Sequence, residues 1–148
     1  MPSRSWLVMI ILFTVSMIPV GCRTEKGPEL TTTGGTILLD GKPVSGVMIQ
    51  FIPKTGTPGN GGFGNTDESG QYTLRSPGGK TGVQPGQYTV IFSKFVMPDG
   101  SAVPEDVQPE SVGAKQALPH RYTSLETSQA EASVDQSSKV FDFSLTTK

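Results

Sequence analysis

Short segments of alternating apolar and polar residues, separated by turn residues, dominate this sequence and limit the folds open to it. From Gly34 onward, apolar and polar residues alternate between clusters of glycine, proline, aspartate and asparagine. No window of about 11 residues keeps the apolar spacing of a helix. Glycine and proline supply 18 and 12 of the 148 residues, which is above average but below the roughly 25–30% typical of low-complexity disorder. The pattern therefore predicts a folded chain of short strands and many turns.

Six segments carry the alternating pattern. The predicted strands cover residues 37–39, 47–52, 71–75, 87–93, 130–134 and 139–145. Alternation assigns one face of these strands to the core, whose main side chains are predicted to be Val47, Ile49, Phe51, Tyr88, Val90, Phe92, Phe141 and Phe143. Strands at this spacing predict an all-β chain that forms a single antiparallel β-sandwich of about seven strands.

Three segments between the strands have distinct turn or loop signals. Residues 40–43, Asp-Gly-Lys-Pro, predict a tight turn in which Gly41 takes a positive φ. Residues 54–65 hold five glycines and predict an exposed, mobile loop. Residues 95–118 contain three prolines and no strand signal. Because connections of this length are uncommon in compact domains, they predict either a functional loop or a disordered insert.

The beginning of the chain has the layout of a secretory signal peptide. Arg4 precedes an apolar run from Trp6 to Val20, which ends at Gly21 and Cys22. The run is shorter than the roughly 20 apolar residues that a membrane-spanning helix needs; an uncleaved anchor helix is the alternative.

The residues before Cys22, Ile-Pro-Val-Gly, resemble the lipobox of bacterial lipoproteins, except that proline stands where leucine is usual. The resemblance implies a signal peptide over residues 1–21 and lipidation of Cys22. A polar tether would then cover residues 22–33 and a single domain residues 34–148. We expect an exported protein that is anchored in a bacterial membrane and faces the periplasm or the cell surface.

Charge and side-chain inventory narrow the possible partners. Lys plus Arg count 12 against 13 Asp plus Glu, so the chain offers no basic field for nucleic acid. A single His and a single Cys are too few for a zinc site, an iron–sulfur site or a Cys–His nucleophile. We therefore expect no nucleic-acid partner, no cofactor and no metal.

Two motifs have both a functional and a structural interpretation. Residues 65–70 begin like an EF-hand calcium loop, but Ser76 stands where calcium needs a bidentate carboxylate. The structural interpretation is a turn in which Asp67 bonds its own backbone and Gly70 takes a positive φ. His120 could be a general base, but its sequence neighbours supply no nucleophile and no orienting acid. The sequence favours a turn without calcium and a protein that is not an enzyme.

Five blocks of sequence run through the body of the chain in a specific order and spacing. They are GTILLDGKPVSGVMIQFIPK (35–54), TDESGQYTL (66–74), VQPGQYTVIFSK (83–94), LPHRY (118–122) and FDFSL (141–145). Together they resemble the small secreted bacterial proteins that carry a carboxypeptidase regulatory-like domain. The resemblance implies a transthyretin-like, or prealbumin-like, β-sandwich in which LPHRY follows a long variable loop. Because most such proteins lack a known activity, it implies the fold more than the function.

Aromatic residues outside the alternating pattern are the candidates for contact with a partner. Phe63 and Phe95 fall in predicted loops, whereas Tyr72 and Tyr88 fall on inward-facing positions. The sequence thus predicts a lipid-anchored, non-catalytic β-sandwich of the cell envelope that acts as a binding or structural module through its long loops. Its partners would be the membrane, through the lipid anchor, and an unknown envelope protein or polysaccharide. The alternatives are a carbohydrate-binding accessory domain and an unrecognised hydrolase.

Overall fold

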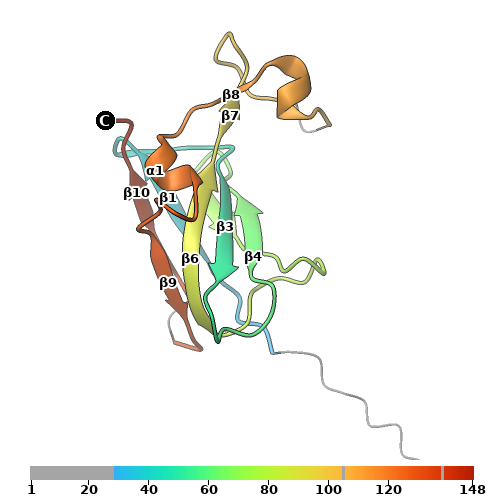
Figure 1. Cartoon of the computed structure of the whole chain (residues 1–148), viewed down its shortest axis with the longest axis vertical. Helices are drawn as coiled ribbons and strands as arrows, with labels where there is room; N and C mark the ends of the chain where they lie inside the picture. The colour runs from blue at the N-terminus through green and yellow to red at the C-terminus, as the bar shows by residue number, and fades with distance from the viewer. Residues whose placement is uncertain (1–28, 105, 138) are drawn as a thin grey trace, which may run out of the picture.

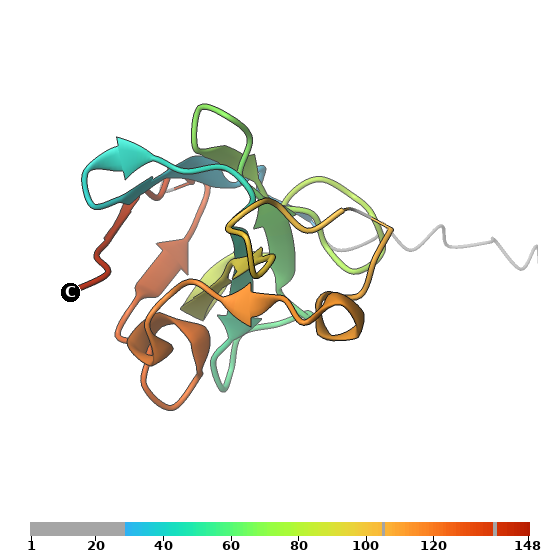
Figure 2. The ribbon, with the colours of Figure 1, turned by 90° about the horizontal axis from the view of Figure 1, so that it is seen from above.

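Alternating side chains bring the inward faces of two sheets together around one interior. The computed structural model describes residues 29–104, 106–137 and 139–148, so the predicted signal peptide and Cys22 lie outside the described residues. The strands run along the long axis of the domain in Figure 1, and the end-on view of Figure 2 shows them around a single interior. The predicted all-β, sandwich-like fold is confirmed.

The first sheet is antiparallel throughout. Its strands, in spatial order, are β4 (Gly62–Asn65), β3 (Met48–Pro53), β6 (Gly86–Ser93) and β9 (Glu131–Val134). In β6, Tyr88, Val90 and Phe92 are buried, and the residues between them are half-buried, as the period of two requires.

The second sheet is built around β1. Its strands are β10 (Phe143–Leu145), β1 (Gly34–Leu39), β2 (Lys42–Pro43) and β5 (Gln71–Thr73), which also pairs with β1. β1 and β10 are parallel, an exception to the predicted antiparallel order. A two-residue turn joins β1 to β2, with φ of 49° at Asp40 and 79° at Gly41. Positive φ at both positions is typical of tight hairpin turns, so the predicted turn is confirmed.

One core fills the space between the two sheets. Six of the predicted core side chains are buried: Val47, Ile49, Phe51, Tyr88, Val90 and Phe92. Phe141 and Phe143 are half-buried at its margin, where their rings pack edge-on at 5.8 Å from Phe51 and 5.1 Å from Phe92, respectively. The other buried apolar side chains are Ile37, Tyr72, Leu74, Val83, Leu118, Ala132, Val134 and Leu145.

The prediction that residues 54–65 form an exposed, mobile loop is wrong for their second half, which contains β4. The reason is close packing of backbones. A Cβ at Gly61 would lie 1.9 Å from the carbonyl oxygen of Phe51, and one at Gly64 would lie 2.6 Å from that of Thr73. These glycines permit the close approach of neighbouring strands.

Residues 95–118 were predicted as a functional loop or a disordered insert, and we call them the insert; their described residues, 95–104 and 106–118, form a projection with short elements of secondary structure. It contains β7 (Phe95–Val96), the 3₁₀ helix η1 (Pro109–Val112) and β8 (Lys115–Gln116), with β7 and β8 antiparallel. Figure 1 shows it extending beyond one end of the sandwich. After the insert, the short helix α1 (His120–Thr123) lies beside β6.

The predicted tether over residues 22–33 is too long at its C-terminal end. Thr31 and Thr33 are buried, and Thr31 exchanges backbone hydrogen bonds of 2.8 and 3.0 Å with Val83. These residues therefore belong to the domain, because a tether would leave its backbone groups to water.

Candidate functional site

The aromatic side chains of the described residues divide into two groups. Seven belong to the core or pack against it: Phe51, Tyr72, Tyr88, Phe92, Tyr122, Phe141 and Phe143. The other two, Phe63 and Phe95, are 45% and 37% exposed. They were predicted to lie in loops, but Phe63 lies on β4 and Phe95 on β7. Both point away from the core and into a groove.

The first groove, which we call the Phe63 groove, lies along the β4–β5 hairpin. It has a volume of about 530 Å³ and is lined by Phe63, Gly64, Asn65, Asp67, Gln71, Tyr72, Thr73 and Arg75. β4 belongs to the first sheet and β5 to the second, so the hairpin spans one side of the sandwich. Phe63 and Arg75 exchange backbone hydrogen bonds of 2.9 and 2.8 Å, which join the two strands.

The turn of this hairpin is built on Asp67. Its Oδ1 accepts hydrogen bonds from the backbone N–H and hydroxyl of Ser69, at 2.9 and 2.7 Å, and from the N–H of Gln71, at 3.0 Å. Gly70 has a φ of 75°. The hydroxyl of Ser69, followed by the N–H of Gln71, holds the pKa of Asp67 below its ordinary value. The predicted turn is confirmed, and its carboxylate is ionised at neutral pH.

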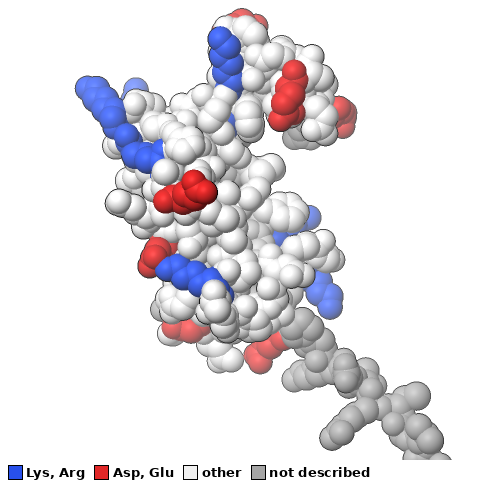
Figure 3. Space-filling model, in the orientation of Figure 1, with Lys and Arg blue, Asp and Glu red and all other residues white. Residues whose placement is uncertain are grey.

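The second groove, the Phe95 groove, lies on the outer face of the first sheet at the base of the insert. It has a volume of about 600 Å³ and is lined by Gln50, Ile91, Phe92, Ser93, Phe95, Gln116, Leu118, His120 and Thr123. None of these side chains is acidic, and the same face of the molecule carries only scattered charges in Figure 3.

The insert is attached at the edge of this groove by Gln116. Its Oε1 accepts hydrogen bonds from the backbone N–H groups of Lys94, at 2.8 Å, and Leu118, at 3.2 Å. The side chain of Lys94 donates to the carbonyl oxygen of Ser45 at 2.5 Å, and burial lowers the pKa of Lys94. The base of the insert is therefore fixed by both backbone and side-chain bonds.

His120 lies on the rim of the Phe95 groove and is exposed. Its carbonyl oxygen accepts hydrogen bonds from the hydroxyls of Thr123 and Thr127. Within the described part of the chain, the His120 imidazole makes no side-chain hydrogen bond.

The opposite wall of the Phe95 groove is α1, which the C-terminal residues hold in place. Arg121 donates to the carbonyl and hydroxyl oxygens of Thr146, at 2.7 and 2.8 Å. Hydrogen bonds from Thr146, followed by Arg121, lower the pKa of Tyr122. The ring of Tyr122 packs edge-on against Phe92. These contacts join residues far apart in sequence, so no local pattern predicted them.

Metal ligands and membrane spans can be assessed only for residues 29–104, 106–137 and 139–148. These residues contain no cluster of three or more His, Cys, Asp and Glu side chains suited to a metal ion. Nor do they contain a helix with the length and apolar character needed to cross a bilayer.

Comparison of the chain with protein-family models, with curated proteins and with solved structures gives no match. The candidate function therefore rests on the geometry of the two grooves.

Proposed function

We propose that this protein is a lipid-anchored, non-catalytic binding module of the bacterial envelope, with Phe63 and Phe95 as its main contact residues. The observation that carries the proposal is that these two aromatic side chains lie outside the core and each lines a groove. Single exposed apolar residues are common on protein surfaces. Here, however, each lies in a groove whose volume falls within the roughly 300–1,000 Å³ of ligand sites.

The chemistry of the grooves supports binding more than catalysis. The Phe95 groove contains one imidazole among amides, hydroxyls and apolar side chains. The Phe63 groove contains one carboxylate, Asp67, whose Oδ1 is already bound in its own turn. General acid–base catalysis needs groups within hydrogen-bond reach of one another. Neither groove brings such a pair together among the described residues.

The binding test compares full-length variants in detergent micelles for affinity to isolated envelope fragments. The double variant Phe63→Ala/Phe95→Ala should bind about tenfold more weakly or worse, because a few aromatic side chains contribute most of the binding energy of a contact surface. Leu125→Ala is the matched control, since Leu125 is also apolar and 50% exposed but lines neither groove. Thermal unfolding should be unchanged in both the double variant and the control. Wild-type affinity in the double variant would contradict the proposal.

The anchor is proposed from the sequence alone and has its own test. Lipidation at Cys22 implies that mass spectrometry of the membrane fraction will find a lipid-modified peptide that begins at this residue. The resemblance to bacterial lipoproteins implies three acyl chains on this residue, which would hold the protein in the bilayer essentially permanently. Cys22→Ala should therefore release the protein or stall its processing. A mature protein that still contains residues 1–21 would contradict the anchor without affecting the binding proposal.

A further inference from the structure

Five polar side-chain groups of the Phe63 groove are not used by the protein itself. They are the side-chain amides of Asn65 and Gln71, the hydroxyl of Thr73, the guanidinium of Arg75 and Oδ2 of Asp67; the hydroxyl of Tyr72, in contrast, donates to the carbonyl oxygen of Phe141. None of the five groups forms a hydrogen bond or ion pair within the described structure, and all five residues are exposed. The groove therefore presents donors and acceptors side by side, with an aromatic ring at one end.

The backbone of the hairpin is also open at this point. β4 and β5 are joined by the bonds between Phe63 and Arg75 and, at the turn, by the N–H of Asp67 bonding to the carbonyl of Gln71. Between these two links, Asn65 and Thr73 exchange no backbone hydrogen bond.

A peptide ligand cannot insert as an additional strand between β4 and β5. Each neighbour in a sheet lies about 4.7–4.9 Å from the next, so an inserted strand needs twice that space. A Cβ at Gly64 would already lie 2.6 Å from the carbonyl oxygen of Thr73. The two strands are thus in contact, and the ligand must lie over the hairpin instead of within it.

We infer that the Phe63 groove binds an uncharged oligosaccharide; this deepens the proposed binding function and rests on it. A sugar ring has an apolar C–H face that packs on an aromatic ring, whose face is electron-rich. Each sugar hydroxyl both donates and accepts hydrogen bonds, as the mixed groups of the groove require. The formal charges of Arg75 and Asp67 cancel, so the lining has no net charge to select an acidic or basic ligand.

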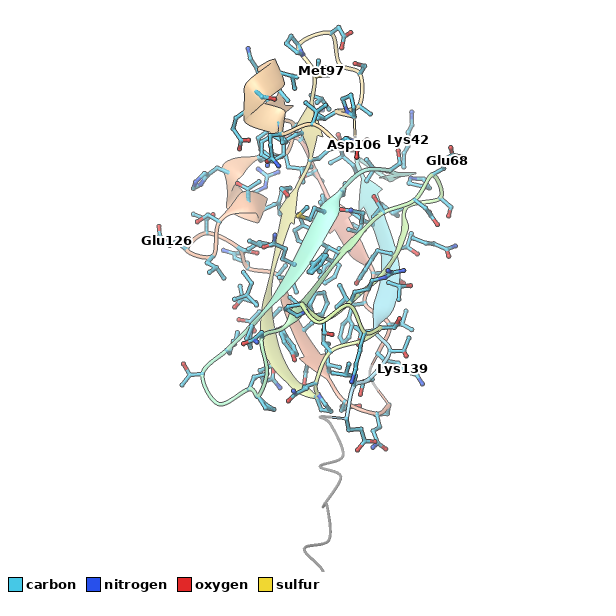
Figure 4. The ribbon with its side chains drawn as sticks, turned by 90° about the vertical axis from the view of Figure 1, so that its right-hand side faces the viewer. Lys42, Glu68, Met97, Asp106, Glu126 and Lys139 are labelled. Carbon is cyan, nitrogen blue, oxygen red and sulfur yellow. The ribbon has the colours of Figure 1, made fainter. Side chains whose placement is uncertain are left out.

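A second hollow beside the Phe63 groove favours a ligand of several linked sugars over a single sugar. It has a volume of about 510 Å³, shares Gln71, Tyr72 and Thr73 with the Phe63 groove, and continues along β1 to Val140, which is 70% exposed. Lys139 and Asp142 also line it, again with cancelling charge. Figure 4 shows Glu68, on the hairpin turn, and Lys139 toward opposite ends of the domain. The two hollows adjoin at β5, and together they suit a ligand longer than a single sugar.

The test is binding of the full chain, in detergent micelles, to a panel of immobilised neutral, acidic and amino glycans. At least one neutral glycan should bind. Phe63→Ala should lower that signal by about tenfold or more, and Phe63→Trp should retain it because stacking is preserved. Leu125→Ala is the control and should leave the signal unchanged, because Leu125 is exposed but lines neither groove. Thermal unfolding of each variant checks that the fold is intact.

Three results would overturn the inference: no glycan binding, binding of charged glycans alone, or equal loss in the Phe63→Ala and Leu125→Ala variants. A second experiment separates this failure from failure of the proposed function. Periodate cleaves the vicinal diols of envelope polysaccharides, whereas protease removes envelope proteins. Binding that survives periodate and is lost after protease would preserve the binding module and overturn the saccharide assignment. Loss after periodate alone supports the assignment.

Discussion

The two grooves differ in what holds their walls. The walls of the Phe63 groove are strands that belong to both sheets. The same segment of chain places Tyr72, on β5, and Leu74, just after β5, in the core. One side of the Phe95 groove is the insert, and Leu118 is the only buried residue among those of the insert that the structure describes. The 3₁₀ helix η1 has no buried residue. The comparison shows that one candidate site is part of the sandwich, whereas the other is partly an addition to it.

This difference has a consequence for local stability. Segments with few buried apolar contacts open at a lower free energy than the strands of the core. The Phe63 groove should therefore keep its shape for as long as the domain is folded. The insert should be able to open at its outer end, beyond β7 and β8, without unfolding the sheets.

The largest effect is expected for Gly64→Val, which tests the rigid groove. If residues 62–65 were an open loop, replacing glycine would be neutral or slightly stabilising, because valine leaves the unfolded chain fewer conformations to lose. In the structure, the added Cβ would lie 2.6 Å from a backbone oxygen. The substitution should cost about 1–3 kcal/mol and abolish binding in the Phe63 groove. Chemical denaturation gives the free energy of unfolding.

Gly78→Val is the matched control for this prediction. A Cβ at Gly78 would meet no atom within 4 Å, and its φ lies in the ordinary range. Its free energy of unfolding should match that of the wild type. Equal stability of the two valine variants would show that β4 and β5 are not packed as closely as described, and the contrast between the grooves would disappear.

Local patterns predicted much of the sandwich. Alternation identified β3 and β6 and their buried residues, such as Phe51 and Tyr88, because one face of each strand packs against the core. The turn at Asp40 and Gly41 was predictable because its backbone conformation depends on those two residues. The glycines of β4 were misread, since glycine serves both mobile loops and close backbone contacts, and only the neighbouring strand distinguishes the two.

The candidate site was predictable in part. Phe63 and Phe95 were singled out because they fall outside the core pattern; both are exposed, although they lie on strands and not in loops. Their neighbours in space, among them Arg75 and Gln116, depend on how β4 meets β5 and how the insert returns to the sandwich. Such non-local pairings leave no signal in the spacing of residues along one strand.

A smaller effect is expected from substitutions in two similar turns, one in the β4–β5 hairpin and one in the insert. Oδ1 of Asp67 accepts from Ser69, and Oδ1 of Asp99, in the insert, accepts from Ser101 with similar geometry. Asp67 alone also accepts from the N–H of Gln71, at the start of β5. Asp67→Asn should therefore lower the melting temperature slightly, and Asp99→Asn should lower it less. An equal or reversed order would show that the insert turn contributes as much to the fold as the hairpin turn.

The same pair of turns predicts a dependence on pH. Hydrogen bonds from the serine hydroxyls are the main cause of a lowered pKa at both Asp67 and Asp99. A lowered pKa in the folded state means that the stabilisation is present above the pKa of the unfolded chain and is lost as pH falls through the folded value. The difference in melting temperature between wild type and Asp67→Asn should shrink from neutral pH to about pH 2. A difference that stays constant would exclude ionisation of Asp67 as its cause.

The smallest effect is expected from shortening the insert, which tests whether the second region is an addition to the fold. Val96 lies opposite Lys115 in the β7–β8 ladder, so Asn-Gly can replace residues 97–114 as a two-residue hairpin turn. Leu118 and the bonds of Gln116 are retained. Because loop closure depends weakly on length, the free energy of unfolding should change by less than about 1 kcal/mol. Chemical denaturation gives this value, and binding to envelope fragments shows whether the removed residues contribute contacts. A loss of several kcal/mol would place the insert within the cooperative fold and would remove the distinction between the two grooves.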